Sequence, residues 1–98
     1  MELGPATKED LIAYLRDAKG LKRKDAEKAV DGILSEITNY FLEGRSVRLS
    51  RFGTFRVIRA EAREMFIPLK GNVTVPAHRV IRFYPSQMLK NRINLKED

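Results

Sequence analysis

The chain of 98 residues contains no cysteine and only one histidine, His78. The absence of cysteine excludes a disulfide framework and any thiolate metal site. A lone imidazole without clustered carboxylates does not form a metal site, and no nucleophile has a base partner that would indicate catalysis. We therefore expect no metal, no cofactor and no enzymatic activity.

Long apolar runs are absent as well. A membrane span needs about 20 apolar residues, and no run in this sequence approaches that length or the length of a signal-peptide core. We therefore expect a cytoplasmic protein with no membrane partner.

The sequence also lacks the alternation of strands and helices that indicates a parallel sheet. Helical periodicity fills the first half of the chain and strand periodicity most of the second, which predicts an α+β fold. The length predicts one small domain over residues 1–98, with loose tails at residues 1–6 and 94–98. A core of this size is thin, so we expect self-association.

The net charge of +6 is unevenly distributed. Residues 1–44 carry seven basic and nine acidic side chains, whereas residues 45–98 carry twelve basic and four acidic ones. The first part is therefore close to neutral and the second strongly basic. This asymmetry suggests a structural half joined to a half that binds a polyanion, either nucleic acid or an anionic membrane.

Two amphipathic helices are predicted before residue 45. The first covers residues 8–18, begins at Thr7 as N-cap with Asp10 completing a capping box, and ends at Gly20. Its apolar face comprises Leu11, Tyr14, Leu15 and Ala18.

The second helix is predicted from Arg23 to Glu43, with Gly44 as its stop signal. Its apolar stripe is wide enough to contact both the first helix and a second subunit. Gly32 within it costs roughly 1 kcal/mol of helix propensity, and a close helix crossing would explain its presence. The stripe comprises Ala26, Val30, Ile33, Ile37 and Tyr40, widened by Ala29, Leu34 and Phe41.

Residues 45–63 are predicted to form two strands joined by a tight turn at residues 52–55, where Gly53 can adopt a positive φ. Each guanidinium fork can hold a phosphate. The arginine content therefore fits a nucleic-acid surface, and a solvated sheet face fits it equally well. The arginines are Arg45, Arg48, Arg51, Arg56, Arg59 and Arg63.

Residues 64–72 are largely apolar, but Pro68 and Gly71 indicate a turn and not a core strand. Residues 73–84 are predicted to form one long strand. Pro76 cannot donate to a ladder, so this part of the strand should be an edge or a protruding ribbon.

Pro85 is expected to begin a last short helix. This helix extends to about Ile93, with Leu89 and Ile93 facing inward.

Three motifs resemble those of the HU and integration host factor (IHF) family of bacterial histone-like, DNA-bending proteins. The resemblance covers residues 7–93, and the last motif is similar to the family's F-x-P-G-x-x-L-K. The motifs are Thr7-Lys8 with Leu11 and Ile12, Phe52-Gly53-Thr54-Phe55, and Phe83-Tyr84-Pro85-Ser86-Gln87-Met88-Leu89-Lys90.

The resemblance implies an intertwined dimer with a helical base, either a homodimer or a heterodimer with a paralogue. Three-stranded antiparallel sheets would form a saddle with protruding β-ribbon arms, here at about residues 59–79. The implied function is that of an architectural, nucleoid-associated protein. It would bind double-stranded DNA through phosphates and the minor groove with little sequence preference.

The arm tip departs from the family's R-x-G-R-N-P-x-x-G. Pro68 and Gly71 match, whereas Met65, Phe66 and Ile67 replace glycine, arginine and asparagine. Loss of that arginine removes a cation from the minor groove, and the phenylalanine adds an apolar group able to wedge between bases. DNA binding should persist because phosphate contacts supply most of the affinity, but the sequence leaves open whether DNA is bent or only coated.

The expected DNA contacts fall into three groups. For Pro68 the alternative is an ordinary turn residue, and for Lys8, Lys90 and Arg92 the alternative is a solvated surface. The phosphate and groove contacts are Arg56, Arg59, Arg63, Lys70, Arg79 and Arg82; the wedges are Phe66 and Pro68; the flanking contacts are Lys8, Lys90 and Arg92.

Three other functions fit the residues less well. The apolar tip could make the chain a self-associating structural protein or protein-interaction module. The basic face and tip could bind anionic lipid. RNA could replace DNA as the partner, although an arm suits a groove better than unstacked bases.

Overall fold

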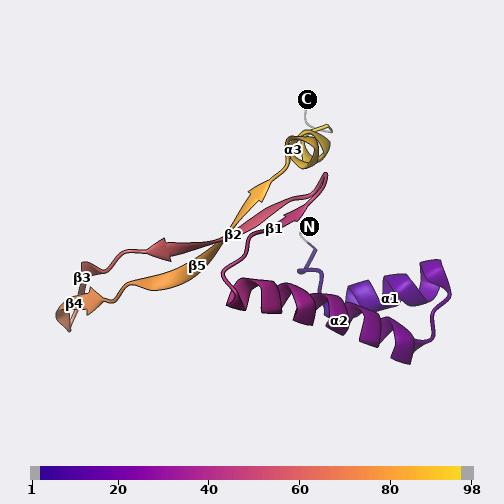
Figure 1. Ribbon diagram of the computed structural model, residues 1–98, viewed down its shortest axis with the longest axis horizontal. Helices are drawn as coiled ribbons and strands as arrows, with labels where there is room; N and C mark the ends of the chain where they lie inside the picture. The colour runs from indigo at the N-terminus through magenta and orange to yellow at the C-terminus, as the bar shows by residue number, and fades with distance from the viewer. Residues whose placement is uncertain (1–2, 96–98) are drawn as a thin grey trace. The chain divides into compact units, whose positions relative to one another are not determined.

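The computed structural model describes residues 3–95, so parts of the two expected tails, residues 1–2 and 96–98, lie outside it. The chain divides into two compact units, residues 1–39 and residues 40–98. Three helices and five strands follow one another in the order α1-α2-β1-β2-β3-β4-β5-α3 (Figure 1). The predicted α+β class is therefore confirmed.

Helix α1 (Lys8–Lys19) begins and ends where the sequence predicts. The backbone N–H of Thr7 donates to Asp10 Oδ2 at 2.8 Å, which caps the first turn. Gly20 closes the helix at a φ of 70°, and its N–H donates to the carbonyl of Arg16 at 3.1 Å.

The core of the first unit is centred on Ile12, which is fully buried. It packs with Ala26, Val30 and Leu15 between α1 and the first part of α2 (Arg23–Leu42). The predicted apolar face of the first helix omitted Ile12 and was wrong in this respect. Leu11 and Tyr14, which that face included, remain more than half exposed.

Gly32 in α2 does not mark a close helix crossing within the described chain. An added Cβ at this position would meet nothing within 4 Å. The helix then ends two residues before Gly44, whose φ of 79° requires the left-handed conformation that glycine adopts at low cost.

Three antiparallel strands form the main sheet of the second unit, in the order β1-β2-β5. They are β1 (Val47–Leu49), β2 (Gly53–Ala60) and β5 (His78–Pro85). The turn between β1 and β2 lies at residues 50–52, with Arg51 at a φ of 69°. The predicted turn at residues 52–55 is therefore displaced.

Gly53 has a steric role and not the conformational one predicted for it. It is buried at the start of β2 and does not have a positive φ. A Cβ here would lie 2.6 Å from the Phe83 ring and 2.7 Å from the carbonyl oxygen of Tyr84. Only glycine lets the two strands approach this closely.

An aromatic cluster covers one face of this sheet. The ring centroids of Phe55 and Phe83 are 4.7 Å apart, and Phe52 lies 5.4 Å from Phe83. Phe41, from the end of α2, adds a ring 6.1 Å from Phe55. Aromatic pairs at these separations stabilise beyond the area they bury, although Phe52 and Phe83 stay 45% and 40% exposed in the single chain, whereas Val47 of β1 is buried.

A second, two-stranded sheet forms the tip of the arm. Strands β3 (Arg63–Ile67) and β4 (Gly71–Val75) pair antiparallel around a turn at residues 68–70. The prediction of a turn over residues 64–72 missed β3, and the predicted long strand of residues 73–84 is interrupted at residues 76–77. Pro76 lies at that interruption, as expected for a residue that cannot donate to a ladder.

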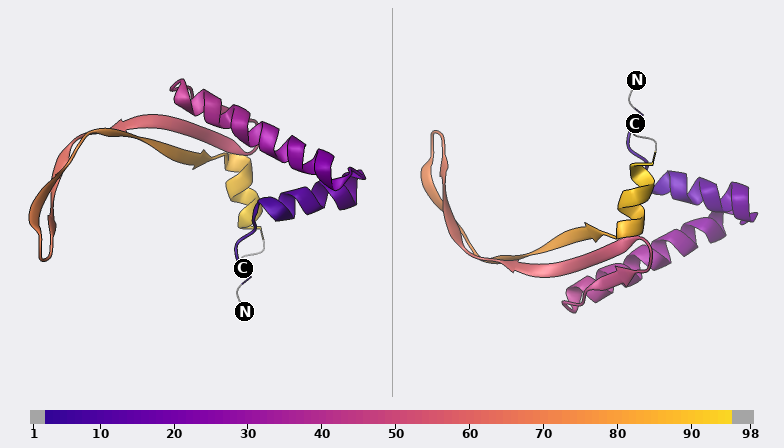
Figure 2. Two further views of the ribbon diagram at one scale, coloured as in Figure 1. Left: turned by 90° about the horizontal axis from the view of Figure 1, so that it is seen from below. Right: turned by 90° about the horizontal axis from the view of Figure 1, so that it is seen from above.

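The ribbon keeps one register from the main sheet to the tip. Ala60 pairs with His78, Arg63 pairs with Val75, and two residues lie between these pairs on each strand. Within each of the two sheets, side chains alternate between two faces; the ribbon as a whole extends away from α3 and curves along its length (Figures 1 and 2).

Helix α3 (Gln87–Ile93) begins after Ser86, whose Oγ accepts a hydrogen bond from the Leu89 N–H at 3.0 Å. The cap is thus Ser86, and Pro85 is the last residue of β5 and not the helix start that was predicted. The expected inward position of Ile93 is also wrong, because its side chain is 68% exposed.

Candidate nucleic-acid interface

One face of the main sheet carries an arginine on each of its three strands. Arg56 on β2 lies directly opposite Arg82 on β5, and Arg48 on β1 lies opposite Thr54. Because successive residues of a strand point to opposite faces, these arginines share the face that points away from the phenylalanine cluster. We call this the arginine face, defined by Arg48, Arg56 and Arg82.

The arginine face is electrostatically unbalanced. Like charges directly opposite each other across a strand pair are destabilising, by about 0.2–1 kcal/mol. Within residues 3–95, the ion pairs that form involve none of these three arginines. Their positive charge is therefore available to an external anion.

A shallow recess lies on the arginine face. It is lined by Ser46 and Arg48 from the β1 side and by Thr54 and Arg56 from β2. Hydroxyl and guanidinium groups are the usual donors to phosphate oxygens. Arg48 was missing from the predicted contacts, although its position between the apolar Val47 and Leu49 already indicated its face.

Two of the predicted contacts lie on the opposite face and have partners there. Arg79 Nη2 donates to the carbonyl oxygen of Phe41 at 2.8 Å, close to the C-terminus of α2. Arg59 lies directly opposite Arg79 and forms an ion pair with Glu61 at 3.6 Å. Arg79 thus closes a helix end, where a cation is favourable, with one of its five N–H donors.

The arm tip presents exposed apolar groups around Pro68. Lys70 N–H donates to the Ile67 carbonyl at 3.0 Å across the turn. Leu69 at the centre of this turn has a φ of 77° and a fully exposed side chain. Phe66 is 69% exposed and lies directly opposite Asn72 in the tip hairpin.

The alternation places the predicted contact Arg63, the first residue of β3, on the opposite side of the ribbon from Phe66. Lys70 is exposed in the turn beside Pro68. The structure therefore divides the predicted ribbon contacts between two faces.

The three predicted flanking contacts differ from one another. Lys90 and Arg92 are exposed on α3. Lys8 forms an ion pair with Asp31 at 2.8 Å, and this hydrogen bond and charge raise the pKa of the lysine above its ordinary 10.5. The pair keeps Lys8 protonated, and its positive charge is partly neutralised by Asp31 of the same unit.

Residues 3–95 contain no group of three or more His, Cys, Asp or Glu side chains that could hold a metal ion. His78 is exposed, and its Nδ1 lies 2.9 Å from the Pro76 carbonyl oxygen. None of the helices over the same residues combines the length and apolar character needed to span a membrane.

Comparison with known proteins identifies the family of the chain. The sequence profile of a family described as bacterial DNA-binding protein matches residues 6–94. The chain belongs to this family.

The relatives found by sequence include both HU proteins and integration host factor subunits. A DNA-binding protein HU from Campylobacter jejuni is 38% identical over 88 residues, which is 89% of this chain and 90% of that protein. An integration host factor subunit alpha from Marinomonas sp. is 35% identical over 92 residues, covering 93% of this chain and 94% of that protein. The expected membership of the HU and IHF family is confirmed.

A solved structure supports the same fold. The chain superimposes on HU from an Anabaena HU–DNA cocrystal structure with a TM-score of 0.81 and 24% identity. The match covers 90% of this chain and 97% of that one. The chain thus has the HU fold.

Proposed function

We propose that the protein is a non-enzymatic architectural protein that binds double-stranded DNA in the bacterial nucleoid, in the cytoplasm. The observation that carries this proposal is the arginine face, where Arg56 and Arg82 lie opposite each other with no ion-pair partner within residues 3–95. A row of DNA phosphates would supply the missing negative charge. Membership of the family supports the same conclusion.

Phosphate contacts are assigned to the arginine face and to cations near it. Guanidinium forks bind phosphate bidentately, so Arg48, Arg56 and Arg82 would hold the duplex backbone. Lys90 and Arg92 on α3 would contact flanking phosphates. Such contacts read no bases, and the expected sequence preference is therefore low.

The arm tip is assigned to the minor groove. Pro68 and Phe66 are both exposed at the end of the ribbon. Apolar side chains of minor-groove proteins insert between base steps and kink the duplex. Lys70 beside them would neutralise a nearby phosphate.

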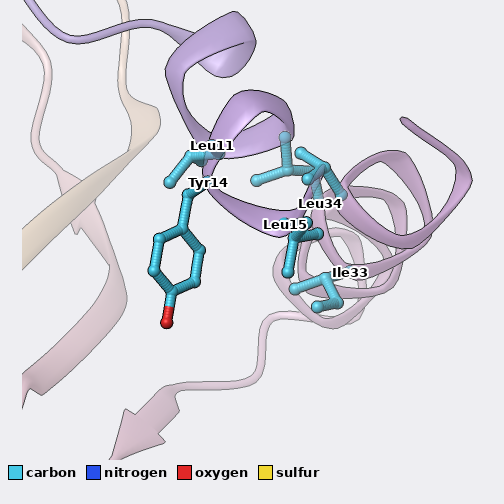
Figure 3. Close-up of a pocket in the computed structure, with 6 residues that line it drawn as sticks. Leu11, Tyr14, Leu15, Ile33 and Leu34 are labelled. Atoms are coloured by element: carbon cyan, nitrogen blue, oxygen red, sulfur yellow. The ribbon is translucent and has the colours of Figure 1, made fainter. Parts of the chain in front are cut away.

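The functional unit is proposed to be a dimer. In the first unit, Leu11 and Tyr14 of α1 and Ile33 and Leu34 of α2 line an apolar groove with Leu15 and Val30 (Figure 3). Ile33 is 62% exposed in the single chain. An apolar groove of this kind on a chain with so few buried residues indicates a second subunit, either an identical chain or a paralogue.

Sedimentation of Ile33→Asp tests the dimer. The wild-type protein should sediment as a dimer, and the variant as a monomer with reduced helix content, because a carboxylate would be buried without a partner. Ser35→Asp adds the same charge to an exposed position of α2 and should remain dimeric. A monomeric wild-type protein would contradict the proposal.

A salt titration on a short duplex labelled at both ends for energy transfer tests the function directly. Binding should weaken steeply as salt rises, because counterions are released from the phosphates. A rise in energy transfer on binding would show that the arms bend the duplex, and an unchanged end-to-end distance would show coating alone. Absence of binding at low salt would disprove the proposed function.

A further inference from the structure

The one histidine of the chain, His78, lies on the same side of the main sheet as the arginine face. It is the first residue of β5 and lies directly opposite Ala60, in the same ladder that pairs Arg56 with Arg82. Because side chains alternate with a period of two along a strand, a position four residues before Arg82 has the same orientation as that arginine. The imidazole therefore faces any DNA that the arginine face holds, and none of the contacts assigned above includes it.

The surroundings of His78 leave its ring exposed and without an acidic partner. The next pair along the ladder on this side is aliphatic. Within residues 3–95 no ion pair involves the histidine, and Glu61, which follows β2, is paired with Arg59 at 3.6 Å. Arg63 and Glu64 belong to the tip hairpin. The ring is thus open to an external group.

A hydrogen bond determines which ring nitrogen of His78 carries the hydrogen in the neutral imidazole. Nδ1 lies 2.9 Å from the carbonyl oxygen of Pro76. A carbonyl oxygen only accepts, so Nδ1 donates, and Nε2 of the neutral ring is then an acceptor. Phosphate oxygens are acceptors as well, so the neutral ring offers no hydrogen bond to a DNA backbone. The protonated ring donates from both nitrogens, which leaves Nε2–H for a phosphate while Nδ1 keeps its bond to Pro76.

We propose that His78 is a further contact to the DNA backbone and that the contact forms only with the protonated imidazole, so that DNA binding strengthens as the pH falls. This inference rests on the proposed DNA-binding function. Histidine is the side chain that ordinarily changes its charge between about pH 5 and 8. Because a phosphate favours the protonated ring, protonation must by reciprocity favour DNA binding to the same extent.

The contact would use a different phosphate from the one that Arg82 holds. The two residues are four positions apart on β5, which is about 13 Å at 3.3 Å per residue and corresponds to about four base-pair steps. A separate phosphate contact releases additional counterions. At low pH the slope of log affinity against log salt should therefore become steeper by about 0.9 per chain, or about 1.8 per dimer.

Duplex titrations at about pH 5.5 and about pH 7.5, the range over which histidine titrates, test the proposal. The wild-type dimer should bind about fivefold more tightly at the lower pH, as expected for two exposed charge contacts. The chain has no second histidine and no cysteine that would add to this change. His78→Gln cannot titrate and should bind equally at both pH values. His78→Lys carries a permanent charge and should bind at both values as tightly as the wild type does at the lower one.

An NMR titration of the imidazole gives a second measurement. The midpoint of the His78 titration should move to higher pH when a duplex is bound, and the neutral ring of the free protein should carry its hydrogen on Nδ1. The inference would be overturned by a wild-type affinity that does not change with pH, by a pH dependence that persists in His78→Gln, or by a midpoint that DNA does not move. Each of these results still requires binding. Absence of binding at both pH values in low salt would instead refute the proposed function.

Discussion

Replacing Arg56 by glutamine should stabilise the folded protein but weaken its binding to DNA. In the free protein Arg56 faces Arg82 across the strand pair, and neither forms an ion pair within the described residues. Removing one of two opposed charges should raise the free energy of unfolding by about 0.2–1 kcal/mol. The same change removes one phosphate contact per chain and two per dimer, which should reduce the slope of log affinity against log salt by about 1.8.

Arg59→Gln is the matched control, because Arg59 faces Arg79 in the same strand pair. Its charge is shared with Glu61, and Arg79 is bound to the Phe41 carbonyl. The control should change stability by less than about 0.5 kcal/mol and leave the salt slope unaltered. Urea unfolding and a salt series of duplex titrations measure both quantities. A less stable Arg56→Gln protein, or one with an unchanged slope, would refute this reasoning.

Three further predictions follow from local geometry. Gly53→Ala should destabilise the fold by about 1–3 kcal/mol in urea unfolding, because the new methyl group would meet the Phe83 ring at 2.6 Å; a neutral result would contradict the close strand approach. Leu69→Gly should relieve about 1–2 kcal/mol of left-handed backbone strain and slow amide exchange in the tip turn, without strengthening DNA binding. Asp31→Asn should return the pKa of Lys8 towards 10.5 in an NMR titration. Because that pKa is raised in the folded protein, the stabilisation by the pair is complete below pH 10.5 and is lost as the pH rises through the folded-state value.

The sequence predicted the helices well, because their signals are local. The capping box at Thr7 and the stop at Gly20 depend on neighbours within one turn, and the structure begins and ends α1 beside them. The prediction placed Leu11 and not Ile12 on the core side of α1, which was wrong. Periodicity alone cannot decide between them, because each fits an apolar helical face. Only the packing of α2 decides between them.

The sheet was harder to predict because glycine and proline have more than one role. Gly53 was assigned to a turn, yet it serves a close contact between strands, and Arg51 adopts the positive φ instead. Pro68 and Gly71 correctly indicated a turn but obscured the strand before it. Strand β3 can be identified only from its pairing with β4.

The division of the arginines between two faces could not be predicted from composition. It depends on which residues of β2 and β5 lie opposite each other and on the partner of each side chain. The link from Arg79 to the end of α2 joins residues 38 positions apart. No local pattern in the sequence indicates such a contact.

The continuous register of the ribbon restricts how the length of the arm can change during evolution or in engineering. A single-residue insertion in one strand, placed between the main sheet and the tip, would turn every residue beyond it to the other face of that strand. Val73 and Val75 would then move to the face that carries Phe66, while Met65 would stay where it is. Viable arms of different length should therefore differ by two residues on one strand, by matched changes on both, or by changes confined to the turn.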